Sequence, residues 1–315
     1  QGPIPLLNMS VIAVIDVGSN SIKVAVVAAA DRRELGRRSE PVRLQPEGGP
    51  AEPFSPEARA EAVAAIGRLL AFARSLGATR CCVLATSAVR ESVSRQEFAR
   101  QVEAATGVPL TIVSGEVEAR LAAAGVRSDP AYQAYADILS FDLGGGSLEV
   151  SVLRGQRCVL ARSFPLGSVR LTHGFLRGGN GPVDELDQLS IRTHLLASLQ
   201  TVVPAGAAEK FLVVGAGGVF AAVALHLEAL GEAPVGGRLP LLRIRELRDR
   251  MCATDLAGRR AIPGIPADRA DIMPAALITL CVLADLTGAE AFHLSHYGVR
   301  HGMIELLLGP SGEHL

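Results

Sequence analysis

Apolar residues near the start of the chain form two short runs with a turn between them. The runs Val11–Asp16 and Ile22–Ala28 are rich in β-branched residues, and the turn-forming residues Gly18–Asn20 separate them. Short apolar runs joined by a glycine-containing turn are typical of a β-hairpin. The pattern therefore predicts a hairpin at this position.

The same pattern occurs a second time, a domain's length further along the chain, at Ser140–Leu153. The residues that align between the two copies are Asp16 with Asp142, Gly18 with Gly144, Ser21 with Ser147, and Lys23 with Glu149. A repeat of this length is too long for a solenoid. It predicts a duplicated domain core.

Strands and helices alternate between the two hairpins. Ser55 and Pro56 begin a helical pattern that Gly77 ends, because serine favours the N-cap, proline the first helical position and glycine the position after a helix. Short buried strands are expected at Cys81–Thr86 and Leu110–Val113. This alternation is typical of α/β domains.

The second half continues the same alternation. Asp129 and Pro130 are interpreted as a linker, and residues 231–240 as a loop rich in glycine and proline. Asp184 is expected to cap a helix whose predicted buried stripe is Leu186, Leu189, Leu195, Leu196 and Leu199. A buried strand, a glycine-rich turn and an apolar helix follow at residues 211–230, and a short helix near the end stops at Gly309.

Composition excludes several classes of function. The chain has 315 residues, of which 49% are hydrophobic, so it can form two globular cores. A net charge of -1 argues against a general nucleic-acid or membrane-surface binder. The five scattered cysteines favour a reduced, cytoplasmic protein. No signal peptide is expected ahead of the first strand, and the eight residues before Met9 are not expected to belong to the fold.

The repeated turns suggest a phosphate site. Glycine lets an anion approach backbone N–H groups closely, so Gly18, Ser19, Asn20 and Ser21 in one copy, and Gly144, Gly145, Gly146 and Ser147 in the other, are candidate phosphate-binding residues. Asp16, Asp142 and Glu149 are candidate ligands of Mg²⁺, or of Mn²⁺ in its place, because carboxylates at strand ends need a partner when buried. Alone, a single glycine-rich run would be read as a tight turn.

Eight motifs, in order, resemble the exopolyphosphatase and guanosine pentaphosphate phosphatase family, within the actin-like phosphotransferase superfamily. They are "AVIDVGSNSIKV", "ATSAVRES", "IVSGEVEARL", "SFDLGGGSLEV", "SFPLGSVRLT", "VVGAGG", "DRADIMPAA" and "LSHYGVRHGMI". The resemblance covers almost the whole chain. It implies hydrolysis of a terminal phosphoanhydride bond and release of inorganic phosphate.

The resemblance also implies roles for single residues. Glu118 falls on the glutamate that activates the attacking water, and Arg90 on an arginine that contacts substrate phosphate. Gly215 and Gly217 lie in a turn that could bind an anion at a helix N-terminus. The residues that depart from the family pattern are Ser94, Val117, Gly218 and His301. These departures put substrate preference in doubt more than the reaction.

The expected architecture is two actin-like, ribonuclease H-like α/β domains with mixed sheets flanked by helices and an active site in the cleft between them. The first domain spans residues 9–128, with the last helix, residues 301–312, packing back on it, and the second spans residues 129–300. The resemblance implies that the substrate is inorganic polyphosphate, guanosine pentaphosphate or both. No nucleic-acid or membrane partner is expected, and a homodimer is expected from the resemblance alone.

Two other functions stay open at this stage. An actin-like ATP-dependent kinase of a small metabolite would use the same two loops, and fold alone does not exclude it. A catalytically weak sensor of polyphosphate or of a phosphorylated alarmone would also bind through them. Glu118 itself could be a solvated helix residue paired with a neighbour such as Arg120, and His293, His296 and His301 have only a loose metal-like spacing.

Overall fold

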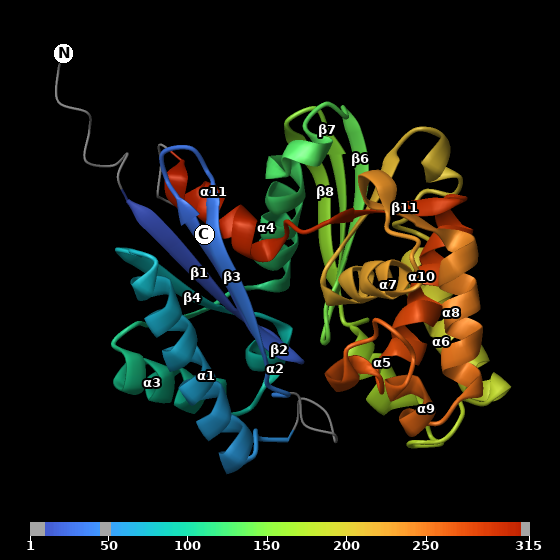
Figure 1. Ribbon diagram of the computed structural model, residues 1–315, viewed down its shortest axis with the longest axis horizontal. Coiled ribbons are helices and arrows are strands. Elements are labelled where there is room, and N and C mark those ends of the chain that lie inside the picture. Colours follow the sequence, from blue (N-terminus) through green and yellow to red (C-terminus); the bar gives the residue numbers. More distant parts are fainter. Residues whose placement is uncertain (1–9, 45–51, 310–315) are drawn as a thin grey trace. The chain divides into compact units, whose positions relative to one another are not determined.

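The computed structural model describes residues 10–44 and 52–309 and divides into two compact units (Figure 1). Unit 1 comprises Gln1–Gly125 and Val299–Leu315, and unit 2 comprises Val126–Gly298. The division therefore falls inside a helix, a few residues before the predicted boundary at residue 129. Residues 1–9 and residues 310–312 of the predicted last helix lie outside the described residues.

Unit 1 contains a five-stranded sheet in the order β3-β2-β1-β4-β5. β1, β2 and β3 are antiparallel neighbours, whereas β1, β4 and β5 run parallel. The strands are β1 (Val11–Val17), β2 (Ser21–Ala28), β3 (Glu34–Pro41), β4 (Arg80–Ala85) and β5 (Leu110–Ile112). The helices are α1 (Pro56–Ser75), α2 (Ser87–Glu91), α3 (Arg95–Thr106), α4 (Gly115–Ser128) and α11 (Val299–Leu308).

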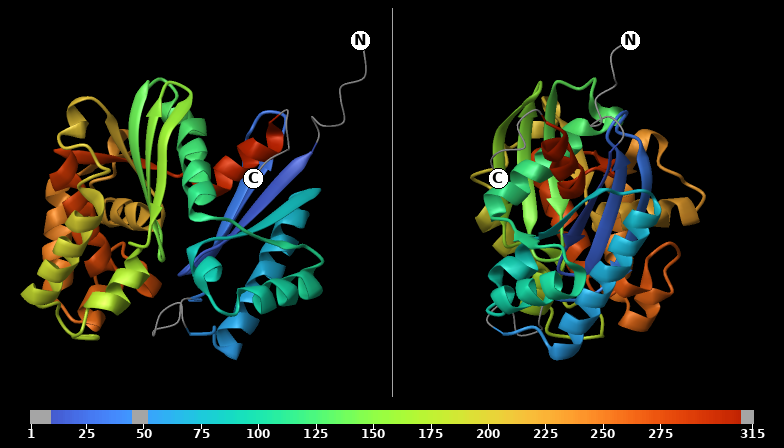
Figure 2. Two further views of the ribbon diagram at one scale, coloured as in Figure 1. Left: turned by 180° about the vertical axis from the view of Figure 1, so that it is seen from behind. Right: turned by 90° about the vertical axis from the view of Figure 1, so that its left-hand side faces the viewer.

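Helices cover both faces of this sheet, which is why its central strands are apolar on both sides (Figures 1 and 2). Ala13 and Ile15 of β1 belong to the core shared with α1 and α3. Ile12 and Val14, which alternate with them, pack with α4 and with Met303 of α11. The last helix of the described chain thus packs on the first strand.

The two residues predicted to cap helix starts do so in the structure. The Ser55 hydroxyl accepts the Ala58 N–H at the start of α1, with Pro56 in the first turn. The Asp184 carboxylate accepts the Asp187 N–H at the start of α6 (Glu185–Leu199) in the same way. Each cap satisfies a backbone donor that has no partner within its own helix.

Unit 2 contains a six-stranded sheet in the order β10-β11-β9-β6-β7-β8. Its strands are β6 (Asp137–Leu143), β7 (Leu148–Arg154), β8 (Arg157–Phe164), β9 (Leu212–Ala216), β10 (Arg238–Pro240) and β11 (Ala291–Ser295). Its remaining helices are α5 (Ser168–Phe175), α7 (Gly218–Ala229), α8 (Leu241–Ala253), α9 (Leu256–Arg260) and α10 (Met273–Thr287). Apart from the added β10, this sheet repeats the order and strand directions of the first.

The core of unit 2 lies between the sheet and helices α7 and α10 (Figure 1). Phe141, Phe220 and Phe292 meet edge to face there, with ring centroids 5.2 and 6.4 Å apart. α10 is buried along nearly its whole length, since α6 and α8 pack on its other sides. The predicted α/β class, with mixed sheets flanked by helices in each of two units, is confirmed.

The predicted buried stripe of α6 was wrong in three of its five positions. Leu186 and Leu189 are 66% and 59% exposed, and Leu196 is 36% exposed. The buried residues are spaced by four, at Ile191, Leu195 and Leu199, and this face packs on α10. Leucines of α6 occur on its exposed sides as well as on its buried side. Hydrophobicity alone therefore did not identify the face that packs on α10.

Two segments predicted as irregular are ordered. The predicted linker at Asp129 is a short 3₁₀ turn (Pro130–Tyr132) in which the buried Asp129 carboxylate accepts hydrogen bonds from the Ala131 N–H and the Ser295 hydroxyl. The predicted loop before residue 240 ends in the short strand β10. Among residues 10–44 and 52–309, no helix combines the length and apolar character needed to cross a bilayer.

Candidate active site

The candidate residues of unit 1 follow the carboxyl ends of its three parallel strands. The Gly18–Ser21 turn follows β1, α2 with Arg90 follows β4, and α4 with Glu118 follows β5. The carboxyl ends of parallel strands lie at one edge of a sheet, where ligands of open α/β sheets bind. The topology thus gathers the predicted residues of this unit at one edge.

The two repeated turns close with the same hydrogen bond. The Gly18 N–H donates to the Ser21 carbonyl at 3.2 Å, and the Gly144 N–H donates to the Ser147 carbonyl at 3.0 Å. In both copies the aspartate two residues before the glycine pairs directly with the residue two positions after the serine. The predicted duplication therefore extends to the pairing of single residues.

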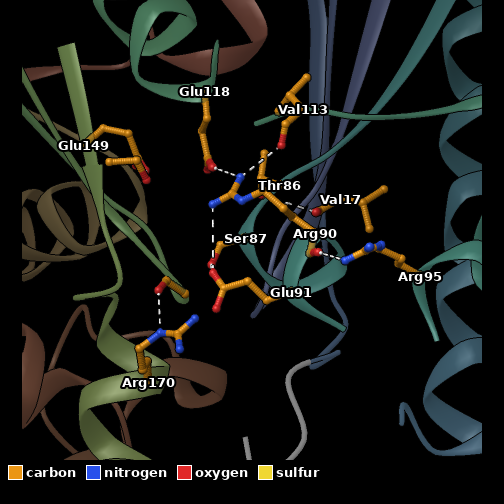
Figure 3. A network of polar contacts seen from close by, with 12 residues as sticks. Val17, Thr86, Ser87, Arg90, Glu91, Arg95, Val113, Glu118, Glu149 and Arg170 are labelled. Atoms are coloured by element: carbon orange, nitrogen blue, oxygen red, sulfur yellow. Dashed lines mark hydrogen bonds and ion pairs between the residues drawn. The ribbon is translucent and has the colours of Figure 1, made fainter. Parts of the chain in front are cut away.

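Glu118 and Arg90 form a buried ion pair in unit 1 (Figure 3). Nη1 of Arg90 lies 2.6 Å from Oε2 of Glu118 and also donates to the Val113 carbonyl at 3.1 Å. Glu118 is only 4% exposed, although it lies in the first turn of α4, whose start is capped by the Ser114 hydroxyl. The ion pair joins the two residues to which the sequence assigned separate roles.

The reading of Glu118 as a solvated helix residue paired with Arg120 is wrong. Arg120 pairs instead with Glu116, and both of these side chains are more than two-thirds exposed. Arg90 lies closer to Glu118 than to Glu91, whose Oε1 is 4.0 Å from Nη2 and accepts the Ser87 hydroxyl. A buried carboxylate that is paired with an arginine is a candidate proton acceptor, whereas the exposed pair is not.

The second turn, Gly144–Ser147, is held through its carbonyl groups by the start of α5. The Gly144 carbonyl accepts the Ser168 N–H, and the Gly145 carbonyl accepts two further backbone N–H groups of α5 at 2.9 and 3.1 Å. The Arg170 Nε atom donates to the Gly146 carbonyl at 3.0 Å (Figure 3). Because a trans peptide directs its N–H away from its C=O, binding the carbonyls on one side leaves the N–H groups directed to the other.

Sequence reasoning missed the residues that support this turn. A Cβ atom on Gly167 would lie 2.3 Å from the Gly145 backbone, so only glycine fits there. Gly167 and Arg170 both belong to the "SFPLGSVRLT" motif, to which the sequence assigned no role. The motif was the only sequence signal for these residues. Its function becomes visible only in the structure, where α5 donates hydrogen bonds to the carbonyl groups of the turn.

Asp142, Glu149 and Ser163 stand in one row across three strands of unit 2. Asp142 pairs directly with Glu149, and Glu149 with Ser163, so the three side chains share a face. The Ser163 hydroxyl donates to Glu149 at 2.8 Å, and Glu149 is 3% exposed. Two carboxylates directly opposite each other repel, and a cation bound to both would relieve that repulsion.

Two glycines leave space for the Asp142 carboxylate that any other residue would occupy. A Cβ on Gly217 would lie 2.8 Å from Oδ1, and a Cβ on Gly298 would lie 2.8 Å from Oδ2. Gly217 also has φ of 96°, which other residues rarely adopt. The predicted anion-binding Gly215 lies instead within β9, where the Phe220 ring fills the space of a side chain.

The residues present fit a magnesium ion at the second hairpin better than at the first. Mg²⁺ binds one or two carboxylates together with phosphate oxygens and water. Asp142 and Glu149 supply two carboxylates, whereas Asp16 faces Lys23 across its hairpin and has Arg300 at 4.0 Å. Within the described part of the chain, no group of three or more acidic, histidine or cysteine side chains could hold a metal, so the loosely spaced histidines form no such site.

The Asp16 carboxylate is nonetheless destabilised by its burial. Its side chain is 18% exposed, and its Oδ1 atom is buried without a hydrogen-bond partner. Burial raises the pKa of Asp16, and the positive charges of Arg300 and Lys23 only partly oppose this effect. The folded protein therefore binds the Asp16 proton more tightly than the unfolded chain does, and its stability falls as the pH rises from 3.8 through the raised pKa.

Replacing Asp16 by asparagine is expected to raise the free energy of unfolding at pH 7 by roughly 1 kcal/mol, because the buried negative charge is removed. The gain should shrink as the pH is lowered, since Asp16 of the parent protein is then protonated. Denaturant unfolding between pH 4 and pH 8 measures it. The exposed Asp31→Asn variant is the control, and a gain that did not depend on pH would contradict the assignment.

The four departures from the family pattern have structural partners. The buried Ser94 hydroxyl accepts the Phe54 N–H, and Val117 packs beside the core that α4 shares with α11. A Cβ on Gly218 would lie 2.5 Å from the Arg269 guanidinium. His301 is 5% exposed with its Nε2 3.4 Å from Glu34, and burial lowers its pKa.

Relatives of the chain are found over nearly its whole length. A model of the Ppx/GppA phosphatase family matches residues 23–309. An uncharacterised protein of Streptomyces coelicolor is 32% identical over 304 residues, which cover 93% of this chain and 88% of that protein. Exopolyphosphatase 1 of Mycobacterium tuberculosis is 29% identical over 308 residues, covering 93% and 87% respectively.

Solved structures of similar proteins have the same fold. An exopolyphosphatase from Cytophaga hutchinsonii superposes with a TM-score of 0.83 at 22% identity, and a Ppx/GppA family member from Aquifex aeolicus with 0.75 at 21%. Each comparison covers 95% of this chain and 98% of the other. At this level of identity the likeness concerns the fold.

Proposed function

The chain belongs to the Ppx/GppA phosphatase family, and from that premise we propose that it is an exopolyphosphatase, which releases orthophosphate from the end of inorganic polyphosphate. Relatives named exopolyphosphatase, at 29% identity over most of the chain, support this choice of substrate. Guanosine pentaphosphate, which ends in the same phosphoanhydride bond, is the second substrate to be tested.

The observation that carries the proposal is the buried Arg90–Glu118 pair. Hydrolysis needs a group that orients water and accepts its proton, and a carboxylate near the substrate phosphate serves this purpose. The Arg90 guanidinium lies beside the Glu118 carboxylate and donates a hydrogen bond to it. Arg90 also supplies positive charge next to the base, where a terminal phosphate would be recognised.

Backbone N–H groups of the two hairpin turns would bind the negatively charged substrate. Turns of this kind bind phosphate oxygens without lysine or arginine, because several N–H dipoles point to one place. The α5 residues that hold the second turn keep these dipoles fixed before substrate arrives. Fixed dipoles contribute more to catalysis than dipoles that must reorient during the reaction.

Asp142 and Glu149 would hold Mg²⁺, since they lie opposite each other on one face of the second hairpin. When bound, the ion would supply positive charge to neutralise phosphate oxygens. Ser163 orients Glu149 by donating to Oε1, and Gly217 and Gly298 leave space for the Asp142 carboxylate.

In the proposed reaction, Glu118 takes a proton from water as the water oxygen forms a bond to the terminal phosphorus. The bond between this phosphorus and the bridging oxygen breaks, and the shortened chain leaves with the electron pair of that bond. Orthophosphate is the other product. Glu118 then returns its proton to solvent, which restores the carboxylate paired with Arg90.

A substrate panel tests the proposal. Release of orthophosphate is measured from long-chain polyphosphate, short-chain polyphosphate, guanosine pentaphosphate and ATP, each with and without Mg²⁺. We expect release from polyphosphate that requires the metal. Transfer of phosphate from ATP to a metabolite would identify a kinase instead, and tight polyphosphate binding without turnover would identify a sensor.

The Gly217→Ala variant is expected to lose stability and activity together. The new methyl group would meet Oδ1 of Asp142 and the Leu143 carbonyl, at a φ unfavourable for alanine. A destabilisation of roughly 1–3 kcal/mol and a loss of about 10- to 100-fold in phosphate release follow from displacing the carboxylate.

Thermal unfolding and the phosphate assay measure these two losses. Gly174→Ala is the matched control, because Gly174 lies exposed in α5 with nothing within 4 Å of the new Cβ. This control should be slightly more stable than the parent protein. Parent-like activity in Gly217→Ala would show that the position of Asp142 does not matter.

A further inference from the structure

Arg43 contacts the first phosphate-binding turn of unit 1, although no motif identified in the sequence includes it. Its Nε and Nη2 atoms both donate to Oδ1 of Asn20, at 3.1 and 2.8 Å. Arg43 follows β3 in the chain, whereas Asn20 lies in the turn between β1 and β2. The contact therefore joins the turn to a segment outside the hairpin.

Arg43 fixes the orientation of the Asn20 side-chain amide, with its oxygen toward the guanidinium. A guanidinium has only donors, so the amide atom that it meets must be the oxygen. The Nδ2 atom consequently lies at the other end, and it is buried without a hydrogen-bond partner among the described residues. Asn20 is 7% exposed, and an unpaired buried donor is unfavourable unless an acceptor comes to it.

Arg43 is itself held in place by its neighbours in the chain. Val42 and Leu44 on either side of it are 4% and 1% exposed, so both anchor the segment in the core. The Leu44 N–H also donates to the Ser19 carbonyl at 3.1 Å. The segment is thereby tied to the turn by a backbone hydrogen bond as well as by the side chain of Arg43.

We propose that Arg43 is a positioning residue that holds the Asn20 amide so that Nδ2 donates a hydrogen bond to a substrate phosphate oxygen. The inference rests on the proposed function, because that function supplies the phosphate. Arg43 acts through Asn20 and not by touching substrate. Its loss should therefore matter only while Asn20 is present.

A double-mutant cycle tests this dependence. The dissociation constant of medium-chain polyphosphate is measured by calorimetry for the parent, Asn20→Ala, Arg43→Met and the double variant, and KM and kcat are measured alongside. Each single variant should weaken binding about ten-fold, and the double variant no more than Asn20→Ala alone. KM should rise with little change in kcat.

The matched control is Arg33→Met, which removes the same charge from an arginine that is 70% exposed and paired with Asp31. It should bind like the parent. Thermal unfolding checks that each variant folds, and Arg43→Lys, which keeps the charge but loses the planar fork, replaces Arg43→Met in the cycle if the latter does not fold.

Losses that multiply in the double variant, or parent-like binding in both single variants, would overturn the role of Arg43. These outcomes are separate from a failure of the proposed function. If the protein hydrolyses polyphosphate but the losses multiply, only the positioning role of Arg43 is overturned. If binding is coupled but no hydrolysis occurs, the proposed hydrolase function is overturned and the role of Arg43 is kept. A parent protein that does not bind polyphosphate overturns both.

Discussion

Replacing Glu118 by glutamine is expected to lower kcat for polyphosphate by about 10²–10⁴-fold, the usual contribution of a general base. The amide has nearly the same shape as the carboxylate and can still accept the hydrogen bond from Arg90. It cannot, however, take a proton from water at neutral pH. Binding of polyphosphate should stay close to that of the parent, because the loss concerns the transition state.

The neighbouring Glu116 provides the matched control. It lies two residues earlier on α4, is 68% exposed and forms an ion pair with Arg120. Glu116→Gln should therefore keep the parent kcat. Steady-state phosphate release and polyphosphate binding are measured for both variants, and a Glu118→Gln protein within two-fold of the parent kcat would remove Glu118 from the role of base.

The second large effect is expected at Asp142 and Glu149. Because they supply the two carboxylates of the proposed metal site, Asp142→Asn and Glu149→Gln should each raise the Mg²⁺ concentration needed for half-maximal activity by at least about 10- to 100-fold. Chelation of Mg²⁺ should abolish phosphate release by the parent protein. Titration of activity with Mg²⁺ measures both effects.

Asp137 serves as the control for this experiment, because it lies on the same strand, β6, at the end away from Asp142 and pairs with Arg154 in the sheet register. Asp137→Asn should need no more Mg²⁺ than the parent. If Asp142→Asn and Glu149→Gln also responded to Mg²⁺ like the parent, the metal would have to bind elsewhere.

The hairpins and their turns could be predicted from the sequence because their signals are local. Each copy contains its alternating apolar residues and its glycine turn within fourteen residues, and the two copies align in register. The opposition of Asp142 and Glu149 follows from the same local pattern, since a tight turn sets the register of its strands. The capping of α1, α4 and α6 is local for the same reason.

The strands β3 and β8 had no such signal. Both lie beside a hairpin, β3 at one edge of the first sheet and β8 at one edge of the second, and most of their side chains are exposed or half-buried. Their sequences therefore lack a buried face with a clear period. Pairing with β2 and β7 determines them, and that pairing is not visible in their own residues.

The contacts that complete the site are long-range, which is why sequence reasoning missed them. Arg90 and Glu118 were named separately, but their ion pair joins helices that follow different strands. Arg43 reaches Asn20 from beyond β3, and α5 holds the Gly144–Ser147 turn from a later segment. In each case the meeting depends on the strand order of a sheet, which local patterns do not encode.

The most direct test of the account is hydrolysis of long-chain polyphosphate in water enriched in ¹⁸O, with the position of the label read by mass spectrometry and ³¹P NMR. Attack of water on the terminal phosphorus predicts that each released orthophosphate carries one ¹⁸O atom, and that chains shorten by one phosphate at a time. Label in the remaining polymer, or release of shorter chains instead of orthophosphate, would contradict it.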